Sequence, residues 1–285
     1  MPRRSLFARP FTCSWPWLTQ RTLTLGNTQY GSESCNTYFS NTYKRIVEKN
    51  NRPSEGLDNW HQHVSSFGLG NYLGYDLPAG QKGLIPDGNY YNSRYKYSWN
   101  GSTNISNAIG QGEILTTPIQ LANFTAAIAN KGYFYTPHIL KQIDKAAVDN
   151  PKFTIPKQTT IDTKHFSSVV EAMHEVFKTG TGKWSQVEGI EICGKTGTAE
   201  NFAKINGKKV QLIDHSILIA FAPKKTPQIA LAIFVENGGY GSAIAAPIAS
   251  LLIEKYVTGI ISKKSKYREQ RILNLSLEKN YAQLN

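Results

Sequence analysis

Residues 193–201 read Cys-Gly-Lys-Thr-Gly-Thr-Ala-Glu-Asn and decide how the whole chain is interpreted. Just before them, Ile190 and Ile192 alternate with polar residues, which is typical of a strand. Lys195 carries a positive charge that can attract a carboxylate, and Gly197 has no side chain to keep a ligand away from the backbone. The stretch therefore predicts a strand whose edge binds an extended, negatively charged ligand as an added strand.

A second interpretation of the same region is a phosphate-binding loop. Residues 189–196 fit the pattern G-x-x-x-x-G-K-T, which requires a flexible loop followed by a helix that starts at the Lys-Thr pair. The supposed loop alternates like a strand, and Asn206-Gly207, a hairpin-turn dipeptide, follows soon after. A nucleotide-binding protein is therefore only a distant alternative.

The rest of the chain predicts a mixed α/β fold. Apolar periodicity and end signals predict helices at 37–50, 59–70, 117–132, 163–178 and 243–260. Strands are predicted at 190–199, 216–222 and 229–235. Residues 74–104 are rich in Gly, Pro, Asn and Tyr and predict a long irregular loop, which is usually functional inside a domain.

The composition suits a globular chain with a basic surface. Of its 285 residues 40% are apolar, and the formal net charge is +12. This charge suggests attraction to anionic surfaces such as phospholipid or cell-wall polymer, and no nucleic-acid recognition motif accompanies it. Neither a membrane span nor a signal peptide is expected.

The cysteines predict no metal site. Cys13, Cys35 and Cys193 are not spaced as metal ligands. Cys35 and Cys193 are expected to be small buried apolar residues.

The segment Ser34-Cys35-Asn36 gains meaning from its place ahead of residues 193–201. A serine hydroxyl near a nucleophile can relay a proton to a leaving amine. An asparagine amide can orient a peptide backbone because it both donates and accepts hydrogen bonds. Ser-x-Asn alone is a weak signal, and a turn or helix start is the ordinary explanation.

Together these motifs resemble the C-terminal part of the transpeptidase domain of class B penicillin-binding proteins, of the elongation type called penicillin-binding protein 2. The family's signatures include Lys-Thr-Gly on a strand and Ser-x-Asn. The segments that carry the resemblance, in family order, are 34–39, 110–113, 117–122, 194–201, 215–223 and 234–239.

The resemblance implies the transpeptidase fold, an antiparallel sheet flanked by helices, and D,D-transpeptidation of peptidoglycan stem peptides. It implies that Ser34, Asn36 and Lys195 are catalytic and that Thr196, Gly197 and Thr198 bind substrate. A backbone N–H near Thr198 would form half of an oxyanion hole. No cofactor or metal is expected.

The chain departs from the family in its nucleophile. The family's Ser-x-x-Lys should precede Ser34 and is absent there. Two literal matches, at 93–96 and 276–279, lie after Ser34 and are interpreted as coincidences, because the motif needs a helix N-terminus. No nucleophile is therefore assigned. The alternative function is a non-catalytic penicillin-binding module in a cell-wall assembly.

The resemblance also predicts the domain organisation and surroundings. Residues 26–261 are expected to form a partial transpeptidase domain that lacks the first two strands and the central helix. Residues 1–25 are unassigned and not expected to be native to the domain, and 262–285 are expected to be a basic, solvated tail. Expected partners are stem peptides, β-lactams, and the glycosyltransferase and scaffold proteins of cell elongation. The full-length family member would act at the periplasmic face of the cytoplasmic membrane.

The missing motif generates a prediction for this chain. It should form no stable covalent adduct with a labelled penicillin, because no serine has a nucleophile context. Intact-mass measurement after incubation with excess drug checks this. An adduct on Ser93 or Ser276 would show that one of the two dismissed matches is real.

Overall fold

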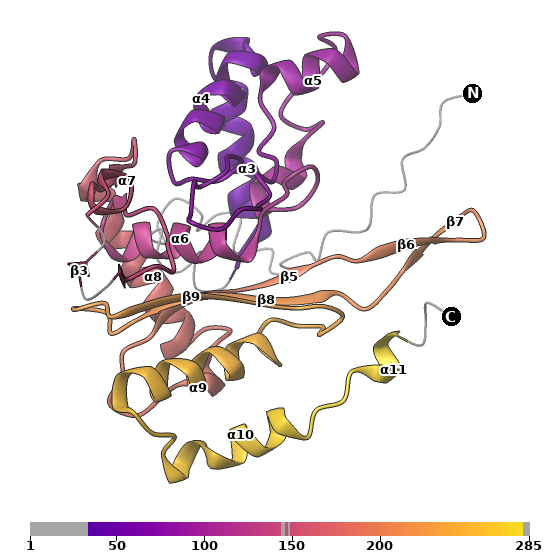
Figure 1. The fold of residues 1–285 in the computed structure, drawn as a ribbon. Coiled ribbons are helices and arrows are strands. Elements are labelled where there is room, and N and C mark those ends of the chain that lie inside the picture. Colours follow the sequence, from indigo (N-terminus) through magenta and orange to yellow (C-terminus); the bar gives the residue numbers. More distant parts are fainter. Residues whose placement is uncertain (1–33, 144–145, 148, 282–285) are drawn as a thin grey trace.

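A three-stranded antiparallel sheet lies at the centre of the fold (Figure 1). The computed structural model describes residues 34–143, 146–147 and 149–281. The sheet consists of β5 (Cys193–Ala199), β8 (His215–Ala222) and β9 (Ile229–Val235), in the spatial order β5–β8–β9. The three predicted strands are confirmed. The near-continuous apolar character of β8 and β9 follows from the helices that cover both faces of the sheet.

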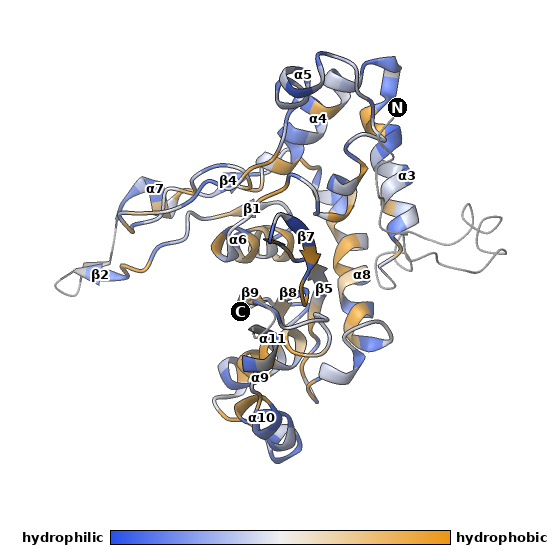
Figure 2. Ribbon diagram, turned by 90° about the vertical axis from the view of Figure 1, so that its right-hand side faces the viewer, coloured by the Kyte–Doolittle hydropathy of each residue, from blue (hydrophilic) through white to orange (hydrophobic). Residues whose placement is uncertain are grey.

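Helices cover both faces of this sheet, so the predicted mixed fold is confirmed. The described helices are α3 (Asn36–Val47), α4 (Pro53–Ser65), α5 (Gly88–Tyr95), α6 (Pro118–Ala129), α7 (Pro151–Thr154), α8 (Phe166–Lys178), α9 (Ala245–Thr258), α10 (Lys266–Leu273) and α11 (Glu278–Tyr281). Short 3₁₀ turns are η1 (Lys49–Asn51), η2 (Ile105–Ile109), η3 (Thr163–His165), η4 (Lys183–Ser185) and η5 (Lys263–Ser265). Figure 2 shows α6 on one side of the sheet and α9 with α10 on the other.

The strand alternation divides the core between these two sides. Cys193 and Phe221 pack with α6 and the first part of α8, whereas Leu218 and Ala220 pack with α9. Successive strand residues point to opposite faces, which produces this division. Cys193 is fully buried, as expected, and burial raises the pKa of its thiol to about 12. It is therefore a packing residue rather than a reactive thiol.

Helix α6 begins as the sequence predicts. The Thr117 hydroxyl accepts a hydrogen bond from the Gln120 backbone, and the Gln120 side chain accepts one from the Thr117 backbone, a capping box with Pro118 at the first helical position. The same Gln120 side chain is 1% exposed and donates to the carbonyls of Asn71 and Lys82. It therefore also fixes the loop before α5 against α6.

Two predicted boundaries are wrong. The second predicted helix, 59–70, starts earlier than expected: α4 begins at Pro53, because a proline is well tolerated where a backbone donor is not needed. The expected irregular loop at 74–104 contains α5, whose N-cap Asp87 accepts a hydrogen bond from the backbone of Tyr90. Tyr91 of α5 is fully buried in a cluster with Trp99. Tertiary burial thus stabilises a helix that local composition disfavours.

The tail expected to be solvated contains α10 and α11. Arg268 of α10 is 7% exposed and donates hydrogen bonds to the Ser250 hydroxyl and to the carbonyls of Trp184 and Gln186. The lysine-rich composition of the tail does not indicate that one of its basic residues, Arg268, is buried and attaches α10 to α9 and η4.

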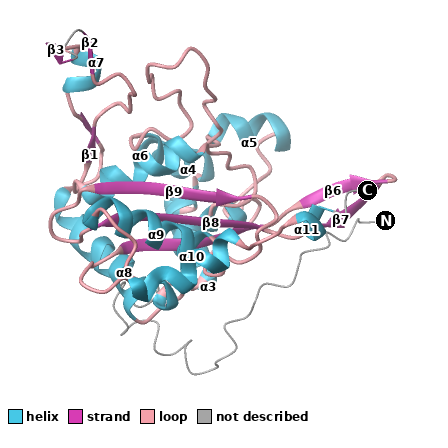
Figure 3. Cartoon of the chain, turned by 60° about the horizontal axis from the view of Figure 1, so that its bottom comes forward, coloured by secondary structure: helices cyan, strands magenta, loops and turns pink. Residues whose placement is uncertain are grey.

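The remaining strands form two-stranded pairs at the periphery. They are β1 (Tyr133–Phe134) with β4 (Lys157–Gln158), β2 (Gln142–Ile143) with β3 (Ala146–Ala147), and β6 (Phe202–Ile205) with β7 (Lys208–Gln211). Figure 3 shows the β6–β7 hairpin projecting from the body. Its turn is Asn206-Gly207, as predicted, and both residues have positive φ.

The phosphate-loop interpretation is wrong. Thr196 lies inside β5, which continues to Ala199, so no helix begins at Lys195. Without a helix N-terminus the backbone donors that hold a phosphate are missing.

No helix in the part of the chain that the structure describes is both long and apolar enough to cross a bilayer. The same residues contain no group of three or more His, Cys, Asp or Glu side chains that could hold a metal ion.

Gly241 packs so tightly against the β5–β8 pair that it leaves no room for a side chain. A Cβ atom there would lie 2.4 Å from the backbone oxygens of both Gly197 and Ile217. We therefore expect Gly241→Ala to lower the free energy of unfolding by about 2 kcal/mol or more, because the β5–β8 pair must shift. Denaturant unfolding measures this, with Ser242→Ala at the exposed neighbouring position as control. Equal unfolding midpoints for the two variants would contradict this packing.

Candidate functional site

The Lys-Thr-Gly-Thr segment lies on an edge strand. β5 pairs with β8 on one side, and no other strand among residues 34–143, 146–147 and 149–281 pairs with its second edge. Lys195 is opposite Ile219, and Thr196 is opposite Leu218. Because directly opposed residues share a face, Lys195 points to the α6 side and Thr196 to the α9 side. An edge with free backbone groups can accept an extended peptide.

Lys195 lies in a largely apolar cavity. The cavity of about 520 Å³ is lined by Tyr38 and Phe39 of α3, by Phe124 and Ile128 of α6, and by one face of α8. The Lys195 ammonium donates a hydrogen bond to the carbonyl of Thr196 at 2.7 Å. None of the ion pairs between described residues includes it.

Burial lowers the pKa of Lys195 from 10.5 to about 8. The cause is desolvation of the ammonium, which is not offset by an acidic partner. Near neutral pH the amine is therefore mostly charged but can release its proton at small cost. Such a group can both attract a carboxylate and exchange a proton.

Ser34 and Asn36 lie at the start of α3. Ser34 has a φ of 55°, and its hydroxyl is buried without a hydrogen-bond partner in the described structure. Asn36 is the first residue of α3 and is exposed. One turn later, Tyr38 and Phe39 line the Lys195 cavity, so the start of α3 lies near β5. No hydrogen bond joins Lys195 directly to Ser34 or Asn36 among these described side chains.

The two threonines of the segment already have contacts. The Thr196 hydroxyl is 2.7 Å from the Thr181 hydroxyl. The Thr198 hydroxyl accepts a long hydrogen bond, 3.5 Å, from the Gly241 backbone. These contacts hold both side chains on the α9 side while the outer edge of β5 stays unpaired by any described strand.

Gln111 is a site residue whose role sequence reasoning did not identify. Its side-chain amide donates to the carbonyl of Thr198 at 3.1 Å. Gly110 and Gly112 on either side both have positive φ, so the Gly-Gln-Gly pattern is a tight turn that presents the amide. That pattern was the available signal. Gln111 thereby fixes the end of β5 against the loop after η2.

A buried polar cluster supports this Gln111 turn. Tyr91 donates its hydroxyl hydrogen to Glu113, and Asn107 donates to the hydroxyls of Tyr91 and Tyr43. Burial raises the pKa of Tyr43 to about 12, and burial with the adjacent Glu113 carboxylate raises the pKa of Tyr91. Both phenols therefore remain donors at physiological pH. The cluster links α3, α5 and the turn, which sequence patterns do not reveal.

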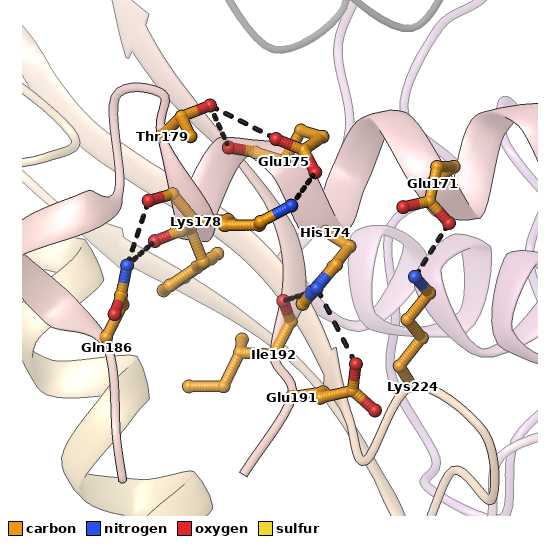
Figure 4. A network of polar contacts seen from close by, with 10 residues as sticks. Glu171, His174, Glu175, Lys178, Thr179, Gln186, Glu191, Ile192 and Lys224 are labelled. Atoms are coloured by element: carbon orange, nitrogen blue, oxygen red, sulfur yellow. Dashed lines mark hydrogen bonds and ion pairs between the residues drawn. The ribbon is translucent and has the colours of Figure 1, made fainter. Parts of the chain in front are cut away.

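Helix α8 holds the beginning of β5 in place (Figure 4). His174 donates from Nδ1 to the carbonyl of Ile192 at 3.4 Å, and its Nε2 is 3.6 Å from Glu191. Glu171 pairs with Lys224 of the β8–β9 turn at 2.6 Å. These contacts attach one helix to the end of the β5–β8 pair at which β5 begins and β8 ends.

Neither literal Ser-x-x-Lys match has nucleophile geometry. Ser93 lies inside α5 and donates to the carbonyl of Tyr90, while Lys96 has a left-handed backbone beyond the helix end. Ser276 precedes the short α11 and accepts a hydrogen bond from the Glu278 backbone. In neither case do serine and lysine share the first turn of a helix.

Comparison with known proteins gives a family match over most of the chain. A model described as the penicillin binding protein transpeptidase domain matches residues 19–254. The peptidoglycan D,D-transpeptidase MrdA of Acinetobacter baumannii is 34% identical over 223 residues, which are 74% of this chain and 32% of that protein. The chain therefore spans about a third of the length of this curated relative.

Solved structures show the same fold. PBP2 of Pseudomonas aeruginosa in complex with WCK 5153 superposes with a TM-score of 0.69 at 28% identity, covering 85% of this chain and 52% of that one. A complex between PBP2 and MreC from Helicobacter pylori superposes with a TM-score of 0.64 at 26% identity, covering 82% of this chain and 40% of that one.

The lowered pKa of Lys195 predicts a change of stability with pH. Between about pH 8 and 10.5 the unfolded lysine holds a proton that the folded one has released. Raising the pH through this window should therefore stabilise the native chain relative to Lys195→Met, by about 3 kcal/mol.

Denaturant unfolding at a series of pH values measures this difference. Lys204→Met removes an exposed lysine from β6 and should show the same pH dependence as the native chain. If the free energies of unfolding of the native chain and of Lys195→Met change in parallel with pH, Lys195 is not desolvated in the fold.

Proposed function

Because the chain belongs to the penicillin-binding protein transpeptidase family, we propose that it forms the substrate-binding part of a peptidoglycan D,D-transpeptidase. One observation carries the proposal: Lys195 lies on an edge strand, beside a cavity, without an acidic partner among the described residues. A charge left uncompensated in a partly apolar site is unfavourable unless a ligand or reaction uses it.

The proposed ligand is a stem peptide that ends in D-Ala-D-Ala and pairs with the open edge of β5. Its terminal carboxylate would meet the Lys195 ammonium on the α6 side of β5, and the hydroxyls of Thr196 and Thr198 would bind the peptide from the α9 side. Gly197 lets the peptide backbone approach, because a side chain there would separate the two strands. The backbone N–H near Thr198 would donate to the oxyanion.

The chemistry proposed is acyl transfer. A serine attacks the carbonyl of the D-Ala-D-Ala bond, the terminal D-Ala leaves as an amine, and the acyl group passes to an amine of a neighbouring stem. Ser34 would relay the proton to the leaving amine, and Lys195, with a pKa of about 8, would exchange that proton with Ser34. Asn36 would orient the peptide through its amide.

The attacking serine is not assigned to any residue of this chain. We propose that residues 34–281 alone bind ligand without turnover and become an enzyme only with a Ser-x-x-Lys segment. A non-catalytic penicillin-binding module is the second candidate, favoured by the geometry of Ser93 and Ser276. Both candidates bind the same ligands and differ in acyl transfer.

The setting of the full-length protein is proposed from its relatives. The Helicobacter pylori structure that this chain resembles is a complex of PBP2 with MreC. A similar scaffold protein and a cell-elongation glycosyltransferase are therefore proposed partners, together with stem peptides and β-lactams. The proposed location is the periplasmic face of the cytoplasmic membrane.

Binding of a synthetic stem pentapeptide ending in D-Ala-D-Ala tests the proposal. Lys195→Met should weaken binding by a factor on the order of ten or more, because the charged contact to the carboxylate is lost. Lys204→Met, which removes a lysine of equal charge from exposed β6, should leave the affinity unchanged. The proposal fails if both variants bind the peptide as the native chain does in calorimetric titration.

A further inference from the structure

A second cavity lies on the opposite side of the sheet from the Lys195 cavity. It has a volume of about 520 Å³ and is enclosed by residues 180–185, by the segment that leads into α9, and by α10. This size is within the range of small-ligand sites. The mechanism proposed above uses no part of it.

The charged residues that line this cavity are all cationic. They are Lys183, Arg268 and Arg271, and no acidic side chain is part of the lining. Arg268 interacts electrostatically with the nearby Glu254 carboxylate. Its guanidinium also donates hydrogen bonds to neutral acceptors. Arg271 donates to the carbonyl of Ala243, and Lys183 forms no ion pair with a described residue. Two uncompensated cations at one cavity favour an anionic ligand.

Two aromatic side chains beside these cations are strongly exposed. Trp184 is 80% exposed and Tyr267 is 65% exposed, and both line the cavity. Lys183 Nζ lies 5.1 Å from the centre of the Trp184 ring. Large exposed rings next to arginine are characteristic of binding surfaces rather than of an ordinary solvated face. Their flat apolar faces suit the C–H face of a sugar ring.

The cavity is directly connected to the proposed substrate strand. Thr181 lines it, and its hydroxyl is 2.7 Å from that of Thr196 on β5. On the other side, Ser242 lines the cavity and follows Gly241, which packs on the β5–β8 backbone at Gly197. The cavity therefore adjoins the α9 side of β5 at Thr196, and a ligand on the edge of β5 can extend into it.

Part of the wall lies outside the family match. The match ends at residue 254, whereas Tyr267, Arg268 and Arg271 are on α10. Two of the three cations of the wall, Arg268 and Arg271, therefore lie beyond the segment that the family model covers.

We propose that this cavity is a subsite for the negatively charged glycopeptide whose peptide end lies on β5. Lys183 and Arg271 bind a stem carboxylate, and Trp184 and Tyr267 cover the adjoining sugar. This subsite rests on the proposed function and adds a specificity for acidic, sugar-bearing stems.

Calorimetric titration of the 285-residue chain tests the subsite. The probes are a disaccharide pentapeptide with free side carboxylates, the same molecule with those carboxylates amidated, and inorganic pyrophosphate. We expect Arg271→Gln and Lys183→Gln each to weaken binding of the acidic probe by about tenfold, because each removes a charge-assisted hydrogen bond. The amidated probe should bind the native chain about as weakly as the acidic probe binds these variants.

The matched control is Lys266→Gln. It removes a positive charge from the same helix, but at a position that pairs with Glu269 and lines no part of this cavity. Its affinity for the acidic probe should equal that of the native chain. Lys183→Gln changes an exposed side chain with no structural hydrogen bond, so it keeps the test valid if Arg271→Gln unfolds.

The outcomes separate this subsite from the proposed function. The subsite is refuted if Lys195→Met weakens binding of the acidic probe while Arg271→Gln and Lys183→Gln do not. The transpeptidase proposal then stands. The proposed function fails instead if Arg271→Gln and Lys183→Gln weaken binding of the acidic probe and Lys195→Met does not. Pyrophosphate binding that depends on Arg271, without any glycopeptide binding, would identify a phosphate site and overturn the glycopeptide assignment.

Discussion

The pairing of β5 with β8 is the constraint on which the other features depend. Its register runs from Cys193 opposite Phe221 to Ala199 opposite His215, and it uses only one edge of β5. A slip of one residue would exchange the two faces and move Lys195 to the α9 side. The tight contact of Gly241 and the polar contacts of α8 oppose such a slip. One register therefore positions both the cation and the open edge.

The two faces of β5 have different electrostatic environments. On the α6 side, Lys195 is surrounded by aromatic and aliphatic side chains, and desolvation makes its proton easy to lose. On the α9 side, Lys183 and Arg271 are exposed and border a cavity whose lining contains no acidic side chain. A single strand thus separates a group suited to proton exchange from groups suited to holding a permanent anion.

Two helices that sequence reasoning did not predict, α5 and α10, form for the same kind of physical reason. Helix α5 has few apolar residues, but burial of Tyr91 against Trp99 stabilises it. Helix α10 is rich in charge, but the buried hydrogen bonds of Arg268 attach it to the domain. In both, a tertiary contact outweighs local propensity, and such contacts leave no periodic pattern in the sequence. Where apolar periodicity and capping signals agree, as in α6, the prediction is confirmed.

By itself, the sequence determined the three central strands, the long apolar helices and the family, because apolar alternation, capping residues and short motifs are local properties of the chain. It also singled out Lys195 and its neighbours as candidates. Only the tertiary structure decided that Lys195 is desolvated, that Gln111 holds the end of β5, and that Arg271 faces the same cavity as Lys183. The last two facts depend on segments about 90 residues apart, and burial and proximity between distant segments exist only after the chain has folded.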